Sequence, residues 1–247
     1  MADFQTLTFE QKGRIAEVTL NRPDSLNALN SEVMAEVAEV FDTIDKTDGI
    51  AVSILTGAGR AFAAGADIKE MQPKSFNDMF ELNFFAGWDR FAACRKPVIA
   101  AVNGFALGGG CELAAAFDFI FVSETARFAQ TETKIGIIPG AGGTQTLSRA
   151  IGERRAKEMI LSGRVFTAQQ ALDWGLANGI CSPETLLETA LAAAQEIAAN
   201  APIAVRQAKQ AIHQGLQIGL TSGLAFEIEA YNRTIPTHDR REGVAAF

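Results

Sequence analysis

The sequence predicts an α/β protein in which buried strands alternate with helices, and three observations indicate this class. An apolar run at residues 97–102 has the composition of a buried strand and leads to three consecutive glycines at 108–110. Strand-like runs nearer the N-terminus surround a segment with helical spacing of apolar residues. From Gly152 onward the composition becomes mainly helical. Because both patterns alternate within one continuous stretch, we expect a single sheet-containing unit.

The N-terminal part predicts two strands, a helix and a third strand. Residues 7–9 and 15–20 flank a short polar turn and indicate a β-hairpin. A helix is expected to start at Ser31 as N-cap, and residues 50–55 indicate a further buried strand. The apolar positions expected to face the core from this helix are Val33, Val37, Val40, Phe41 and Ile44.

The remainder of the chain predicts further helices and one more strand. Residues 111–117 favour a helix, 117–122 a strand, and 144–150 a helix that opens after a glycine-rich turn. Ser182 followed by Pro183 is a typical helix start. Pro202 ends that helix, and the further helices expected after it run to about residue 219, from 221 to 234 and from 239 to 247.

Composition restricts the class of function. The chain has 247 residues, 48% of them apolar, which is typical of a globular protein with a large core. Its net charge of -7 argues against a general nucleic-acid or anionic-membrane surface. Cys94, Cys111 and Cys181 show no paired or metal-ligand spacing. Together with an N-terminus that lacks a secretory pattern, this predicts a cytoplasmic protein without a metal site.

The glycine loop suggests chemistry on a carbonyl compound. A glycine loop between a strand and a helix exposes backbone N–H groups, and the helix N-terminus adds partial positive charge. Glu112 falls in the first turn of that helix, and Glu132 follows later in the chain. Taken singly, Glu112 is more simply explained as a favourable helix-start acid and Glu132 as a solvated surface acid.

Three blocks of sequence give the chain a family resemblance. They are AFAAGADIK at residues 61–69, ALGGGCEL at 106–113 and PGAGGT at 139–144. In this order and spacing they resemble the crotonase (enoyl-CoA hydratase/isomerase) superfamily. The resemblance implies a ββα spiral core at residues 1–195 and a C-terminal α-helical oligomerisation region at 196–247. It also implies a homo-oligomer, either a trimer or a hexamer built from two trimers.

The resemblance assigns roles to particular residues. Glu112 and Glu132 would be the catalytic acids, and the N–H groups of Ala66 and Gly109 would form the oxyanion hole. The residues implied in coenzyme A binding are Ser25, Leu26, Ala28, Ala64, Ala66, Asp67, Ile68, Lys69, Gly109 and Gly140. Those implied for the acyl pocket are Met71, Phe84, Phe85 and Trp88, although an aromatic stripe is more often core. Coenzyme A belongs to the substrate, so no separate cofactor is expected.

Retention of both acids favours a reversible enoyl-CoA hydratase acting on an acyl-CoA thioester. Two alternatives remain open at this stage. One is a Δ3-Δ2-enoyl-CoA isomerase or another lyase with the same oxyanion hole, and the other is a catalytically idle binding protein on the same fold. We expect neither nucleic acid nor a membrane as a partner, and short or medium straight acyl chains as substrates.

Overall fold

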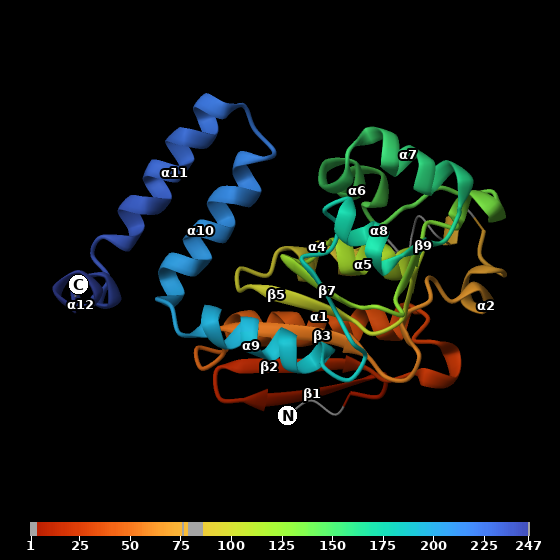
Figure 1. Ribbon diagram of the computed structural model, residues 1–247, viewed down its shortest axis with the longest axis horizontal. Helices are drawn as coiled ribbons and strands as arrows, with labels where there is room; N and C mark the ends of the chain where they lie inside the picture. Colours follow the sequence, from red (N-terminus) through yellow and green to blue (C-terminus); the bar gives the residue numbers. More distant parts are fainter. Residues whose placement is uncertain (1–3, 76, 79–85, 247) are drawn as a thin grey trace.

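The larger of two sheets forms the base of the protein. The computed structural model describes residues 4–75, 77–78 and 86–246 (Figure 1). The sheet has strand order β1-β2-β3-β5-β7-β10, with β1 and β2 antiparallel and the other neighbours parallel. Its strands are β1 (Leu7–Lys12), β2 (Ile15–Leu20), β3 (Val52–Gly57), β5 (Val98–Val102), β7 (Phe119–Ser123) and β10 (Gly179–Cys181). The predicted hairpin is therefore confirmed as β1 and β2.

A smaller second sheet alternates with the first along the chain. It has the order β4-β6-β8-β9, in which β4, β6 and β8 are parallel and β9 is antiparallel to β8. Its strands are β4 (Ala61–Ala63), β6 (Phe105–Leu107), β8 (Arg127–Ala129) and β9 (Phe166–Thr167). From β3 to β8 each successive strand joins the other sheet, so the backbone winds as a spiral. This arrangement confirms the predicted α/β class.

The first helix, α1 (Ser31–Lys46), packs an apolar stripe into the core. All five apolar positions expected to face inward are buried. The predicted N-cap is wrong by one residue, because the side chain of Asn30, not Ser31, accepts the Val33 N–H at 2.9 Å. The N–H of Ser31 instead donates to Glu70 Oε2 at 2.8 Å, and its hydroxyl also contacts the Glu70 carboxylate.

Two later helices begin at other residues than the sequence predicts. α5 starts at Gly109, two residues before the predicted Cys111, because Gly108 with φ 51° ends the preceding loop. α9 starts at Leu186, because residues after Ser182 form a turn in which Thr185 N–H donates to Ser182 O. The remaining described helices of the core are η1 (Pro23–Ser25), α2 (Ile68–Met71), α4 (Ala86–Ala92), α5 (Gly109–Ala115), η2 (Glu132–Ile135), α6 (Gly143–Ile151), α7 (Glu153–Ser162), α8 (Ala168–Asp173) and α9 (Leu186–Ala198).

Two apolar clusters hold the larger sheet between layers of helices. The bigger cluster includes Val18, Phe41, Leu55 and Phe128 and lies between the sheet, α1 and the smaller sheet. On the other face α9 lies against β2, β3 and β5 (Figure 1). Its small residues, including Ala190 and Ala194, pack against apolar side chains of these strands. Residue 196, where the sequence predicts the C-terminal region to start, lies within α9.

The last three helices extend away from both sheets. α10 (Pro202–Gly215) and α11 (Leu220–Thr234) pack against each other as an arm, and α12 (His238–Ala246) follows (Figure 1). α10 ends before the predicted residue 219, and α11 and α12 agree with prediction to within one residue at their starts. Every described side chain of α10 is at least partly exposed. Lys209 Nζ joins this arm to the core by donating to Asp118 Oδ2 at 2.7 Å.

Close backbone contact between α5 and β4 gives a stability prediction. A Cβ on Gly110 would lie 1.9 Å from the carbonyl oxygen of Ala63, so Gly110→Ala forces one backbone segment to move. We expect a loss of unfolding free energy of about 3 kcal/mol or more. Gly215→Ala is the control, since a Cβ there meets no atom within 4 Å. Chemical unfolding should leave this control near the wild type, and equal stability of the two variants would contradict the close contact.

Candidate active site

One cavity gathers both predicted catalytic acids and both predicted oxyanion-hole residues. Its volume is about 60 Å³, room for a few water molecules. Its lining comes from α1, α2, α4, α5 and η2 and from the loops before α1, before α2 and between η2 and α6. Its lining residues are Leu29, Met34, Ala66, Met71, Trp88, Gly109, Glu112, Glu132, Ile137, Ile138, Gly140 and Ala141.

Two backbone N–H groups meet at the wall of this cavity. Gly109 is the first residue of α5, so its N–H has no acceptor within the helix. Ala66 forms a parallel bridge with Leu29, in which Leu29 N–H donates to Gly65 O and Asp67 N–H to Leu29 O, both at 2.8 Å. A Cβ on Gly109 would lie 3.8 Å from Ala66 N. Among the described residues neither N–H has a protein acceptor, so both are available to one ligand oxygen.

Glu112 points into the cavity from the first turn of α5. Its residue is only 3% exposed, and its Oε1 accepts N–H groups from Ala141 at 2.9 Å and Gly143 at 2.7 Å. These N–H groups come from the turn before α6 and from its first residue. Burial raises the pKa of Glu112 to about 6, and the charge of Glu132 adds to that rise. The two N–H groups oppose the rise in pKa because they stabilise the carboxylate.

Glu132 approaches the cavity from a different element, the short helix η2 that follows β8. Burial raises the pKa of its carboxyl group as well. The buried Gln130 amide, with its nitrogen toward the carboxylate, lies 2.9 Å from Oε2 and 3.1 Å from Oε1. Gly108 leaves room for this carboxylate, since a Cβ there would lie 2.8 Å from Glu132 Oε1. Thr131 stands at the N-cap of η2 without a capping bond from its side chain.

The structure separates the predicted site residues into two groups. The cavity brings together Glu112, Glu132, Ala66, Gly109, Gly140, Met71 and Trp88. The other residues predicted to contact coenzyme A lie outside its lining, either on the turn around η1 or in the first turn of α2 and the residues before it. They are Ser25, Leu26, Ala28, Ala64, Asp67, Ile68 and Lys69. These two segments are adjacent, because Ala64 N–H donates to Leu26 O at 3.0 Å. Phe84 and Phe85 lie outside the described residues.

Sequence reasoning missed several residues of the cavity. The lining also includes Leu29, Met34, Ile137, Ile138 and Ala141. The side-chain amide of Gln130 contacts the Glu132 carboxylate. Apolar residues at such positions look like ordinary core in a sequence. The position of Gln130, two residues before Glu132, was the one available signal, because a polar residue at the end of a buried strand needs a partner.

Neither a metal cluster nor a membrane helix is present in the described part of the chain. Residues 4–75, 77–78 and 86–246 contain no group of three or more His, Cys, Asp or Glu placed to hold a metal ion. None of the helices among them is both long and apolar enough to cross a bilayer.

Fold and site together define a class of α/β protein in which two backbone N–H groups, one buried carboxyl group and one half-buried carboxyl group face one cavity. Comparison with known proteins identifies the family. The protein-family model described as enoyl-CoA hydratase/isomerase matches residues 10–247 of the chain. The chain therefore belongs to the enoyl-CoA hydratase/isomerase family, the crotonase superfamily, and the resemblance seen in the sequence is confirmed.

Individual relatives support this placement over the full length. The chain is 46% identical over 244 residues to a probable enoyl-CoA hydratase of Rhizobium meliloti strain 1021, covering 99% of this chain and 95% of that protein. It is 43% identical over 249 residues to a mitochondrial enoyl-CoA hydratase of Pongo abelii, covering 100% and 86%. A crystal structure from Geobacillus kaustophilus HTA426 matches with a TM-score of 0.97 at 40% identity, covering 100% and 96%.

The raised pKa of Glu112 gives a prediction about stability and pH. In the folded protein the Glu112 carboxyl group keeps its proton up to about pH 6, whereas the ordinary pKa of a glutamate is 4.5. The free energy of unfolding of the wild type therefore falls as the pH rises from 4.5 to about 6. Glu112→Gln has no carboxyl group to ionise, so it does not lose this stability. We expect the unfolding free energy of the variant to be about 2 kcal/mol higher than that of the wild type above pH 6.5, and the difference to shrink toward pH 4. Glu188→Gln, at an exposed position of α9, controls for the substitution. A difference that does not change with pH would contradict the prediction.

Proposed function

We propose that the protein is an enoyl-CoA hydratase, which adds water reversibly across the double bond of a trans-2-enoyl-CoA. One observation carries the proposal: the buried carboxyl group of Glu112 and the half-buried carboxyl group of Glu132, from separate elements, face a cavity of about 60 Å³ beside two N–H groups without acceptors among the described residues. The cavity has room for a water molecule and one reacting carbon–carbon bond. The names of the relatives described above agree with this activity.

In the proposed reaction the N–H groups of Ala66 and Gly109 bind the thioester carbonyl oxygen. Attack of water on Cβ moves electrons onto that oxygen, and the two donors stabilise the resulting enolate. The loss of one comparable donor costs about 3–4 kcal/mol in other enzymes. The helix N-terminus at Gly109 adds partial positive charge in the same direction.

The two carboxyl groups complete the addition. Glu112 accepts a proton from the attacking water as its oxygen bonds to Cβ, and Glu132 donates a proton to Cα. With a pKa of about 6, Glu112 is mostly ionised at neutral pH, and its two N–H donors hold it in one orientation. Glu132 retains a proton more readily than an exposed glutamate because burial raises its pKa. The charge of Glu132 raises the pKa of Glu112, so the proton held by one group affects the role of the other.

The lining of the cavity favours a short, uncharged acyl chain. Met34, Met71, Trp88, Ile137 and Ile138 supply apolar surface. The described lining residues include no lysine or arginine that would pair with a distal carboxylate. Coenzyme A itself would lie along the turn at Ser25–Ala28 and along residues 64–69, outside the cavity. No cofactor besides this substrate moiety is required by the proposed reaction.

Glutamine substitutions test the proposed roles of the acids. Glu112→Gln and Glu132→Gln should each lower kcat for crotonyl-CoA by at least about 100-fold, the usual effect of losing a positioned acid or base. Glu188→Gln is the control because it makes the same change on the exposed surface of α9. Thermal unfolding verifies that each variant is folded. Turnover near the wild-type rate in either variant would remove that residue from the mechanism.

A change at Gly109 tests the oxyanion hole. Gly109 has an ordinary backbone conformation, and a Cβ there would meet only Leu29 Cδ1 at 3.5 Å and Ala66 N at 3.8 Å. Gly109→Val is therefore expected to fold, while its methyl groups occupy the space in front of the two donors. We expect loss of turnover and of enoyl-CoA binding, measured by steady-state kinetics and by calorimetry. Unchanged kinetics in a folded variant would contradict the assignment.

We further propose that the protein assembles as a trimer or as a hexamer of two trimers through its C-terminal helices. Large apolar side chains are exposed along α10 and α11; they include Ile212 (68%), Leu216 (71%), Leu220 (78%), Leu224 (51%), Ile228 (61%) and Tyr231 (64%). Soluble monomers rarely expose so extended an apolar surface. If this apolar surface is buried between subunits, residues 202–246 form the oligomerisation region.

Light scattering at micromolar concentration measures the assembly. We expect the mass of three or six chains, and a shift to smaller species when Leu216 and Leu220 are both replaced by Glu, since the charges would be buried in the contact. A monomeric mass for the wild type at full activity would contradict the assembly.

We also propose a cytoplasmic location. Cys94, Cys111 and Cys181 are free thiols in the described structure, and two of them are buried. Unpaired buried thiols are typical of proteins that work in a reducing compartment.

A further inference from the structure

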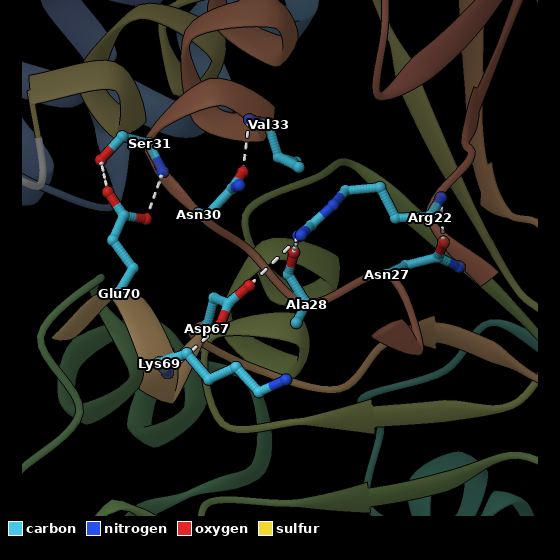
Figure 2. A network of polar contacts seen from close by, with 9 residues as sticks. All are labelled: Arg22, Asn27, Ala28, Asn30, Ser31, Val33, Asp67, Lys69 and Glu70. Atoms are coloured by element: carbon cyan, nitrogen blue, oxygen red, sulfur yellow. Dashed lines mark hydrogen bonds and ion pairs between the residues drawn. The ribbon is translucent and has the colours of Figure 1, made fainter. Parts of the chain in front are cut away.

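A polar network outside the cavity joins the segment that carries Ala66 to the segment at residues 28–29 (Figure 2). Its centre is the guanidinium group of Arg22. Nη1 donates to the carbonyl oxygen of Ala28 at 2.6 Å, and Nη2 donates to Asp67 Oδ2 at 3.3 Å. The side chains of Arg22 and Asp67 are 23% and 17% exposed, so solvent screens this pair only in part. Arg22 does not belong to the lining of the cavity.

The two contacts of Arg22 enclose the bridge that fixes Ala66. Ala28 directly precedes Leu29, and Asp67 directly follows Ala66. The bridge itself consists of Leu29 N–H to Gly65 O and Asp67 N–H to Leu29 O. Because a planar guanidinium group holds both donors in a fixed geometry, Arg22 restricts how far the segment at 28–29 can move relative to that at 65–67. The direction of the Ala66 N–H depends on this alignment.

The turn that carries Arg22 is itself held in a strained conformation. Leu26 and Asn27 have φ of 53° and 54°, a region that residues other than glycine rarely adopt. Asn27 is 1% exposed; it accepts Arg22 N–H at 2.9 Å and donates to Ala58 O at 3.0 Å and Ala61 O at 2.8 Å. Such strain persists where the surroundings determine the conformation. The turn is thus anchored to β4 at one end and, through Arg22, to Asp67 at the other.

Asp67 uses its two carboxylate oxygens for different purposes. Oδ2 faces Arg22, and Oδ1 accepts Lys69 N–H at 3.2 Å as the N-cap of α2. Asparagine caps helices as well as aspartate does but carries no charge. The substitution Asp67→Asn therefore keeps the cap and weakens only the contact with Arg22.

We propose that Arg22 and Asp67 are positioning residues that direct the Ala66 N–H at the thioester oxygen. This inference rests on the proposed function, because it takes Ala66 as an oxyanion donor. When the pair is lost, the Ala66 peptide gains freedom to turn away from the developing negative charge. Substrate still binds through its other contacts, so kcat falls and KM changes little.

Four variants measure this effect: Arg22→Met, Arg22→Lys, Asp67→Asn and the double variant Arg22→Met with Asp67→Asn. We expect kcat for crotonyl-CoA to fall by about 10- to 100-fold in Arg22→Met and Asp67→Asn, as for other small displacements of a catalytic group, with KM within about threefold of the wild type. The double variant should be no slower than Arg22→Met alone, since Arg22→Met already removes the contact with Asp67 together with the one to Ala28 O. Arg22→Lys keeps the charge but not the paired donors, and should recover only part of kcat.

Arg95→Met is the matched control. Arg95 also pairs with an aspartate, donating from its backbone N at 3.0 Å and from Nε at 2.8 Å to Asp45, away from the cavity. Its kcat should equal that of the wild type. Additive losses in the double variant, an unchanged kcat in Arg22→Met and Asp67→Asn, or a raised KM at unchanged kcat would overturn the proposal. The last result would mean that the substituted residue, Arg22 or Asp67, acts in binding coenzyme A and not in positioning Ala66.

A measurement without turnover separates this inference from the proposed function. The absorption band of bound cinnamoyl-CoA moves to longer wavelength when its carbonyl oxygen is polarised by hydrogen bonds. We expect a smaller shift in Arg22→Met and Asp67→Asn than in the wild type and in Arg95→Met. If the wild type shifts the band but hydrates no enoyl-CoA, the hydratase proposal fails and the positioning role stands. If all variants shift the band equally, the positioning role fails whatever the activity.

Discussion

The close approach of the backbone at residues 108–110 to the smaller sheet is the constraint on which the site depends. Gly110 lies directly against the Ala63 carbonyl group, and Gly108 leaves the space that the Glu132 carboxylate occupies. No residue with a side chain fits at Gly110 without moving one of the two segments. Because α5 begins at this point of contact, the N–H of Gly109 lies near the N–H of Ala66 at the cavity. The first turn of α5 also places Glu112 in the cavity. The packing of the spiral and the chemistry of the site therefore share one contact.

The same arrangement has an energetic cost, because it removes the carboxyl group of Glu112 from water and half-buries that of Glu132. Burial disfavours the ionised forms of Glu112 and Glu132, and their proximity adds to that effect at Glu112. Hydrogen bonds from Ala141, Gly143 and Gln130 offset part of it. A fold selected for stability alone would place apolar side chains here. The cost is intelligible if the pair must hold and release protons near neutral pH.

Local patterns in the sequence were sufficient for the class and for most elements, because alternation of apolar residues and glycine-rich turns are local signals. The start of α9 was missed because Ser182 and Thr185 both fit an N-cap, and the tertiary structure selects the later one. The alternation between two sheets was predicted only through the family resemblance, as a ββα spiral, since sheet membership depends on pairing between distant strands that local patterns do not show. The site acids, Ala66 and Gly109 were predicted through the family resemblance. The contact of Arg22 with Asp67 was not, because nothing in either local segment specifies it.

The products formed from two isomeric substrates test the central claim most directly. Crotonyl-CoA and its 3-enoyl isomer are incubated separately with the protein in D2O, and the thioesters are analysed by mass spectrometry and NMR. The account predicts that crotonyl-CoA gives 3-hydroxybutyryl-CoA with one deuterium retained at Cα, and that this hydration is faster than any conversion of the 3-enoyl isomer. Conversion of the 3-enoyl isomer without hydration of crotonyl-CoA, or binding of both without turnover, would contradict it.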